Sequence, residues 1–219
     1  MPPALDHVFI CTDDPRSAER ALADFGLRFA QRVIHRGQGT ANACAFFDNA
    51  YLELLWGHDN DELQSEVVES LALWERVRWR ETGASPFGIA LRPDGDVEVD
   101  TWAYKAPFLP AGASIPIVTP RSECHEPLVF LILGSQAPAT LPLERRPPLE
   151  HRGRRRLLTG VTVFGPMPPR RSPGLDALCD LGVIAIRPAA EQHLELEWDS
   201  ATCGELHDFR SVVPLVLRW

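Results

Sequence analysis

The sequence predicts an α+β protein built from tandem β-α-β-β-β modules, because short segments recur along the chain. "LDHVFI" (residues 5–10) matches "LTGVTV" (158–163), and "YLELLW" (51–56) matches "HLELEW" (193–198). Between these segments both halves place a capping residue, a proline, an amphipathic helix and a glycine. "PFGIAL" (86–91) is a weaker third echo of the first strand. Self-similarity of this kind indicates repeated copies of one supersecondary unit.

The first module is predicted over residues 4–56. Its first strand alternates and carries β-branched and aromatic side chains. Asp14 then caps a helix whose first position is Pro15, and Gly26 ends that helix. Three further strands follow: residues 27–36 and the two arms of a hairpin that turns at 48–49.

The rest of the chain predicts one long helix and two less regular modules. An apolar stripe on one face predicts a single helix over residues 59–80, with Asp59 at its start and Gly83 closing its end. A second, degenerate module is expected over 86–134, and a third, partial repeat over 157–219. We expect the whole chain, 1–219, to form a single domain. The apolar stripe of the helix predicted over 59–80 consists of Leu63, Val67, Leu71, Trp74 and Val77.

The composition of the chain limits the classes of function that it can have. The 219 residues are 45% apolar, which allows a sizeable core, and the net charge of −8 disfavours nucleic acid as a partner. We expect no membrane span, since no run approaches 18 apolar residues, and no secretory signal. Five cysteines without a CxxC pair then predict reduced thiols in a cytoplasmic protein. A single lysine, many arginines and 20 prolines suggest a GC-rich bacterial genome.

At this point the chain resembles the vicinal oxygen chelate superfamily (glyoxalase, bleomycin resistance and dioxygenase proteins), within its glyoxalase-like branch. The matching elements are "LDHVFI" with the capped helix behind it, the loop "GQGTAN" (37–42) and "YLELLW". "PFGIALRP", "LEHRGRRRLLTGVTV" and "DFRSVVPLVL" are also similar to that branch. The resemblance implies that the mixed sheets curl into a cup around a divalent metal. It further implies metal ligands on the first and last strand of each module.

Carried over to this sequence, the resemblance assigns the first module's two metal ligands, which are also its catalytic candidates, to His7 and Glu53. An imidazole and a carboxylate suit Zn, Fe, Mn, Co or Ni and leave positions for substrate oxygens. Both residues alternate with apolar neighbours, so we expect their side chains to share the cup's interior. The alternative for His7 is a buried histidine bonded to a backbone carbonyl, and for Glu53 an outward position on an edge strand.

The equivalent positions of the other modules break the pattern. In the second module the first-strand ligand position falls on Gly88 and the last-strand position near Leu133. In the third copy, Gly160 matches His7 and Glu195 matches Glu53. A set of four ligands is therefore absent from the pattern. Either other residues complete a metal site, for which His35, His125 and His151 are the candidates, or the cup binds its ligand through hydrogen bonds.

Four further residues are candidates for substrate binding: His35, Thr40, Asn42 and His151. The first three belong to or precede the "GQGTAN" loop, and Thr40 and Asn42 could bond a substrate carbonyl or carboxylate. His151 stands in "LEHRG", where the glyoxalase-like branch also tends to place a histidine. Ordinary turn chemistry is the alternative for the loop residues.

The connection over residues 135–156 is rich in proline and arginine. One interpretation is a solvated linker, which the sequence favours. The other is a clamp for an anionic substrate at the mouth of the cup, since guanidinium groups bind carboxylate or phosphate in bidentate fashion. The arginines concerned are Arg145, Arg146, Arg152, Arg154, Arg155 and Arg156.

Two functions stay open for the small-molecule ligand. The first is a glyoxalase-like enzyme with metal-assisted lyase, isomerase or hydrolase chemistry on a substrate with adjacent oxygens. The second is a protein that binds a small molecule without metal or chemistry, stacking it on aromatic rings. Modules of the superfamily often pair across chains, so a homodimer and a chain that closes its own cup are both open. The rings named for stacking are Trp56, Trp74, Trp79, Trp102 and Phe87.

Overall fold

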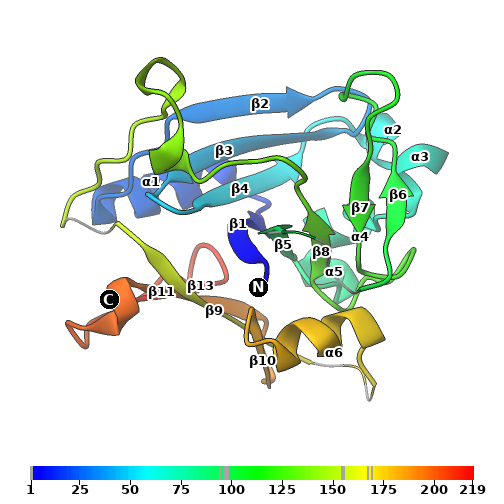
Figure 1. Ribbon diagram of the computed structural model, residues 1–219. Helices are drawn as coiled ribbons and strands as arrows, with labels where there is room; N and C mark the ends of the chain where they lie inside the picture. Colours follow the sequence, from blue (N-terminus) through cyan, green and yellow to red (C-terminus); the bar gives the residue numbers. More distant parts are fainter. Residues whose placement is uncertain (1, 94, 96–98, 154–155, 167, 169) are drawn as a thin grey trace.

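The structure is a computed structural model that describes residues 2–93, 95, 99–153, 156–166, 168 and 170–219. It confirms the α+β fold with mixed sheets and few helices (Figure 1). One sheet has eight strands in the order β2-β3-β4-β1-β5-β8-β7-β6, and the other has five in the order β10-β9-β11-β13-β12. None of the described helices is long and apolar enough to cross a membrane.

The eight-stranded sheet comes from the first two predicted modules. In the first, Asp14 caps α1 by accepting a hydrogen bond from the amide of Ser17, and Gly26 closes the helix in a left-handed conformation. These contacts confirm the predicted helix ends. The bounds are β1 Ala4–Cys11, α1 Pro15–Phe25, β2 Gln31–His35, β3 Thr40–Phe46, β4 Tyr51–Gly57, β5 Phe87–Arg92, β6 Trp102–Tyr104, β7 Ile115–Ile117 and β8 Leu128–Leu131.

The predicted helix over 59–80 is wrong as a single element. Four short helices replace it, because Ser65 is extended and Ala72 adopts a left-handed backbone with φ 52°. Asp59 does cap the first of them, and the carboxylate of Glu62 accepts hydrogen bonds from the amides of Gly37 and Gly39. The segments are α2 Asn60–Leu63, α3 Glu66–Glu69, α4 Leu73–Val77 and α5 Trp79–Thr82.

The five-stranded sheet holds the third predicted module. Its helix α6 (Pro173–Asp180) starts after Ser172, but the Ser172 hydroxyl and amide both donate to Glu126, which ties this part to the second module. The remaining bounds are β9 Leu158–Gly165, β10 Ala185–Pro188, β11 His193–Trp198, β12 Leu206–Asp208 and β13 Leu215–Arg218, with 3-10 turns at Pro138–Thr140, Leu143–Arg145 and Asp199–Ala201.

Each face of the eight-stranded sheet packs into its own apolar cluster. On its convex face, side chains such as Val8 and Ile10 of β1 join α1, α6 and the five-stranded sheet in one core. On the concave face, Phe9 of the same strand packs with Phe130 of β8 and the short helices α2 to α4. This alternation along β1 is the expected period of a strand whose two faces are both covered.

Candidate functional site

A cavity of about 410 Å³ lies within the concave face of the eight-stranded sheet. One wall comes from β1 to β4, and the other comes from β6 to β8 and their loops. The two edge strands meet here: the hydroxyl of Tyr104, on β6, donates to Oε1 of Gln38, in the loop after β2, at 3.0 Å. One chain therefore curls into a cup by joining the opposite ends of its own sheet.

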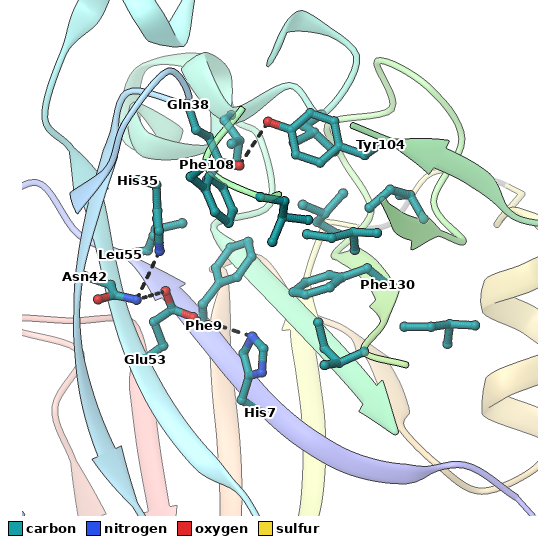
Figure 2. A pocket seen from close by; sticks show the side chains of 18 of the residues that line it. His7, Phe9, His35, Gln38, Asn42, Glu53, Leu55, Tyr104, Phe108 and Phe130 are labelled. Carbon is teal, nitrogen blue, oxygen red and sulfur yellow. Dashed lines mark hydrogen bonds and ion pairs between the residues drawn. The ribbon is translucent and has the colours of Figure 1, made fainter. Parts of the chain in front are cut away.

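His7 and Glu53 lie together on the cavity wall (Figure 2). Strands β1 and β4 are parallel neighbours, with His7 paired to Tyr51 and Phe9 paired to Glu53, so both side chains project from the same face. The His7 Nε2 atom is 3.5 Å from Oε2 of Glu53. Each residue is only 5% exposed. The structure therefore brings the two predicted ligand residues to one place.

A β-bulge adds a third member that the sequence analysis missed. The pairing of β1 with β5 slips between Leu5 and His7, so Asp6 is an extra residue and can share a face with its neighbour. Oδ1 of Asp6 is 2.8 Å from Nδ1 of His7, and Oδ2 accepts hydrogen bonds from Arg92 and Ser135. Burial opposes the charge of Asp6, but these partners together lower the pKa of its carboxyl group. An ionised carboxylate accepts only, so Nδ1 of His7 carries the proton.

Asn42 holds the carboxylate of Glu53. Its Oδ1 accepts a hydrogen bond from the amide of Val33, which fixes the orientation of the side-chain amide. Nδ2 therefore donates to Oε1 of Glu53 at 2.7 Å. A carboxylate offers about four acceptor sites. Besides this bond, Glu53 has its longer contact with His7, so it keeps capacity for a ligand.

His35 and Thr40 extend this polar wall towards Tyr104. Nδ1 of His35 is 2.9 Å from the hydroxyl of Thr40, which accepts a second hydrogen bond from Nε2 of Gln38. His35 lines the cavity, whereas Thr40 is fully buried, is not part of the described lining and contacts the ring of His35. Burial is the main cause that lowers the pKa of His35, opposed by Glu53 and helped by His7.

His151 lies apart from this group. Its Nδ1 accepts a hydrogen bond from the amide of Arg28, and its Nε2 is 2.8 Å from the carbonyl oxygen of Phe46. Both ring nitrogens thus bond backbone groups, and the described lining of the cavity does not include this residue. Its position is that of a structural tie between the connection and the first module.

The aromatic rings of the cavity differ from those named in the sequence analysis. Phe87 belongs to the core on the convex side, and none of Trp56, Trp74, Trp79 and Trp102 is part of the described lining. The ring of Tyr51 stacks on His7 with centroids 4.3 Å apart, and Phe130 meets His7 edge-on at 5.4 Å. The rings that do line the cavity are Phe9, Tyr51, Tyr104, Phe108 and Phe130.

The arginine connection runs outside the cavity as far as the structure describes it. Arg145 and Arg146 are exposed, and Arg146 donates to the carbonyl of Leu141. Arg156 forms an ion pair with Asp48. Arg154 and Arg155 lie outside the described residues. The described arginines therefore agree with the linker interpretation, and none of them lines the cavity.

The donor set does not fit a divalent metal. Among the described residues no group of three or more His, Cys, Asp and Glu side chains has metal-binding geometry. A catalytic zinc typically has three protein ligands. At Gly88 a side chain is excluded, since a Cβ atom there would stand 2.0 Å from the Phe9 ring. Leu133 lies beyond the end of β8 and is 64% exposed. The Phe9 ring thus occupies the space that a side chain at position 88 would need.

These features define a cup-shaped α+β protein with a mostly apolar cavity and a buried Asp-His-Glu group on one wall. The Glyoxalase-like domain family model matches residues 5–149, and the chain belongs to that family. The match covers the eight-stranded sheet, so the recognised family unit contains the whole described cavity.

Solved structures are similar to this chain at low sequence identity. A hypothetical protein from Staphylococcus aureus is 13% identical with a TM-score of 0.60, covering 100% of this chain and 99% of that chain. A variant of 4-hydroxymandelate synthase from Streptomyces coelicolor is 15% identical with a TM-score of 0.49, covering 90% of this chain and 72% of the synthase. A xylose isomerase-like TIM barrel/4-hydroxyphenylpyruvate dioxygenase fusion protein is 12% identical with a TM-score of 0.45, covering 90% and 36%. No curated protein matches the sequence.

Proposed function

We propose that the cavity binds a small, mostly apolar molecule and that His7 transfers a proton on it. The carrying observation is the Asp6–His7–Glu53 group, buried at the wall of a cavity that is otherwise largely apolar. Charged groups are expensive to bury without partners, and titratable groups gathered at a cavity wall are typical of a functional site.

The arrangement assigns distinct roles to the three side chains. Asp6 orients the ring by accepting the Nδ1 hydrogen, which leaves Nε2 of His7 facing the cavity and Glu53. Nε2 then takes a proton from the bound molecule. Glu53, held by Asn42, binds a donor group of the ligand and stabilises the imidazolium that forms. Proton removal beside a carbonyl leaves an enolate. Return of the proton from His7 to another carbon completes an isomerisation, and departure of a β-substituent with its electron pair completes an elimination, which are isomerase and lyase reactions.

Deuterium exchange tests this function without knowledge of the natural substrate. A panel of aryl ketones and α-aminoketones is incubated with the protein in D₂O, and mass spectrometry follows deuterium uptake at carbon. We expect protein-dependent exchange that falls about 10²-fold or more in a His7→Gln variant. An Asp6→Asn variant should lose less and shift its pH profile. Exchange that is unchanged in His7→Gln would refute the role of this residue.

A second candidate function is binding without chemistry. The observation that favours it is the lining itself, in which five aromatic rings and many aliphatic side chains surround few polar groups. Panel compounds that bind tightly but never exchange would support this alternative.

Because the described residues do not form a complete set of metal ligands, we also predict the metal content of the protein. We expect purified protein to bind less than one equivalent of Zn, Fe, Mn, Co or Ni, and a chelator to leave its melting temperature unchanged. Stoichiometric metal that disappears in a His7→Ala variant would overturn the metal-free assignment.

A further inference from the structure

The charges around the cavity are unbalanced. Among the described residues its lining holds one carboxylate, Glu53, and no lysine or arginine. The second nearby carboxylate, Asp6, is different because Arg92 donates to its Oδ2 at 2.9 Å and offsets its charge. The cavity therefore has one negative group without a permanently cationic partner.

Glu53 is directed at the ligand space. It is buried, its Oε1 accepts the hydrogen bond from Asn42, and its Oε2 has the 3.5 Å contact with His7. In Figure 2 its carboxylate lies between Asn42 and His7 at the edge of the space bounded by Phe9 and Phe130. A group bearing several N–H donors and a positive charge would fill the remaining acceptor sites of this carboxylate.

The aromatic rings around His7, on the same wall as Glu53, suit the same kind of group. Tyr51 and Phe130 both contact the ring of His7, and Phe9 is paired with Glu53 across the parallel strands. The faces of aromatic rings attract ammonium groups, and more strongly where water is excluded. Away from this wall, Leu71, Leu73 and the side chains of β7 and β8 offer an apolar surface for the rest of the molecule.

We propose that the ligand of this cavity is an apolar molecule with a protonated amine, whose ammonium group pairs with Glu53, and that carboxylates and phosphates are rejected. This inference rests on the proposed function, because it names the class of molecule on which His7 acts. An anion placed beside Glu53 would meet a like charge in a poorly hydrated site, without a described lysine or arginine to offset it.

Matched probes test the charge preference. Each set shares one skeleton and differs only in its polar group: 4-phenylbutylamine, 4-phenylbutanol and 4-phenylbutyrate, with the corresponding naphthyl and adamantyl compounds. Binding is measured by isothermal titration calorimetry on the full chain at pH 7. We expect at least one amine to bind about 10-fold more tightly than its alcohol and about 100-fold more tightly than its carboxylate.

Two variants test whether the preference for amines depends on Glu53. Glu53→Gln should remove the advantage of the amine over the alcohol, while the melting temperature shows that the fold is retained. Glu195→Gln is the matched control, since this carboxylate occupies the equivalent place in the repeated "LEL" segment but lies in the other sheet and pairs with Arg218. It should leave the preference unchanged. If Glu53→Gln does not fold, Glu53→Asp is the second variant: it keeps the charge but withdraws it by one methylene, so it should reduce the advantage of the amine over the alcohol, and an undiminished advantage would overturn the assignment to this residue.

Equal binding of the three probes, tighter binding of the carboxylate, or no binding of any set would overturn the amine proposal. Amine preference that survives in Glu53→Gln would overturn the assignment to this residue. The proposed proton transfer fails separately, when exchange in D₂O is independent of His7 while the amine preference persists.

Discussion

Substitution of Gly88 by alanine tests whether Phe9 closes the second-module side of the cup. Gly88 lies on β5 opposite Phe9 of β1. A Cβ atom at this position would stand 2.0, 2.3 and 2.4 Å from three atoms of the Phe9 ring. Carbon atoms in contact are about 3.5–4.0 Å apart, so ring or strand must move by more than 1 Å. The added methyl group therefore overpacks a site where both partners are buried.

The expected loss of stability follows from that overlap. Overpacking of a core by one small group costs about 1–3 kcal/mol. For a chain of this size, each kcal/mol lowers the melting temperature by about 2–4 °C. We therefore expect Gly88→Ala to melt about 2–12 °C lower, with a matching decrease in the urea midpoint followed by circular dichroism.

A control and a second substitution make this prediction specific. Gly160→Ala is the control, since Gly160 takes the equivalent first-strand position in the third module and its Cβ would stand 3.1 Å from the Cβ atom of Glu197, a much smaller overlap than at Gly88. It should cost less than about 0.5 kcal/mol. Phe9→Leu should partly rescue Gly88→Ala, giving a coupling energy of about 1 kcal/mol. A neutral Gly88→Ala variant, or strict additivity with Phe9→Leu, would refute the proposed contact.

Three further predictions concern single residues. Burial lowers the pKa of His35 below 6.5, so as pH falls the unfolded chain protonates this side chain before the folded chain does. The contribution of neutral His35 to the free energy of unfolding is therefore complete above pH 6.5 and is lost as pH falls through the folded pKa. The urea midpoint of His35→Gln should then depend less on pH between 7 and 5 than that of the exposed control His58→Gln, and equal slopes would contradict this. Ala72→Gly should raise the unfolding free energy by about 0.5–1 kcal/mol, measured by urea titration, because it relieves the left-handed backbone; a loss would argue against the helix break. Arg76 is fully buried and donates to four backbone carbonyls, so Arg76→Leu should cost about 3–5 kcal/mol in the same assay, and a cost below 1 kcal/mol would show that those carbonyls find other partners.

The sequence predicts most of the first module because its signals are local. The capping pair Asp14 and Pro15, the terminal Gly26 and the alternation along β1 act over a few residues, and each appears in the structure. The shared face of His7 and Glu53 also follows from alternation, once the two strands are known to be parallel neighbours. The assignment of these residues to a ligand remains a prediction.

Features that depend on contacts between distant segments could not be predicted in this way. The apolar stripe over 59–80 satisfies a helical pattern, but tertiary packing breaks the backbone at Ala72 so that Leu71 and Leu73 both line the cavity. Residues two apart on a continuous helix do not share a face. Likewise, the hydrogen bond between Tyr104 and Gln38 joins residues 66 positions apart, and no local sequence pattern predicts it.

The two walls of the cup differ in their chemical character. Every imidazole and carboxylate among the described lining residues comes from the first module, at positions such as His7, His35 and Glu53, whereas the wall from β7 and β8 is mainly aliphatic and aromatic. A bound molecule must therefore present its polar end to the first wall and its apolar body to the second, since the reverse orientation would bury both the carboxylate and the ligand's polar group without partners. If the proposed function holds, substitutions such as Phe130→Leu should change which molecular body is accepted, while the orientation and the proposed proton transfer should still depend on the first wall.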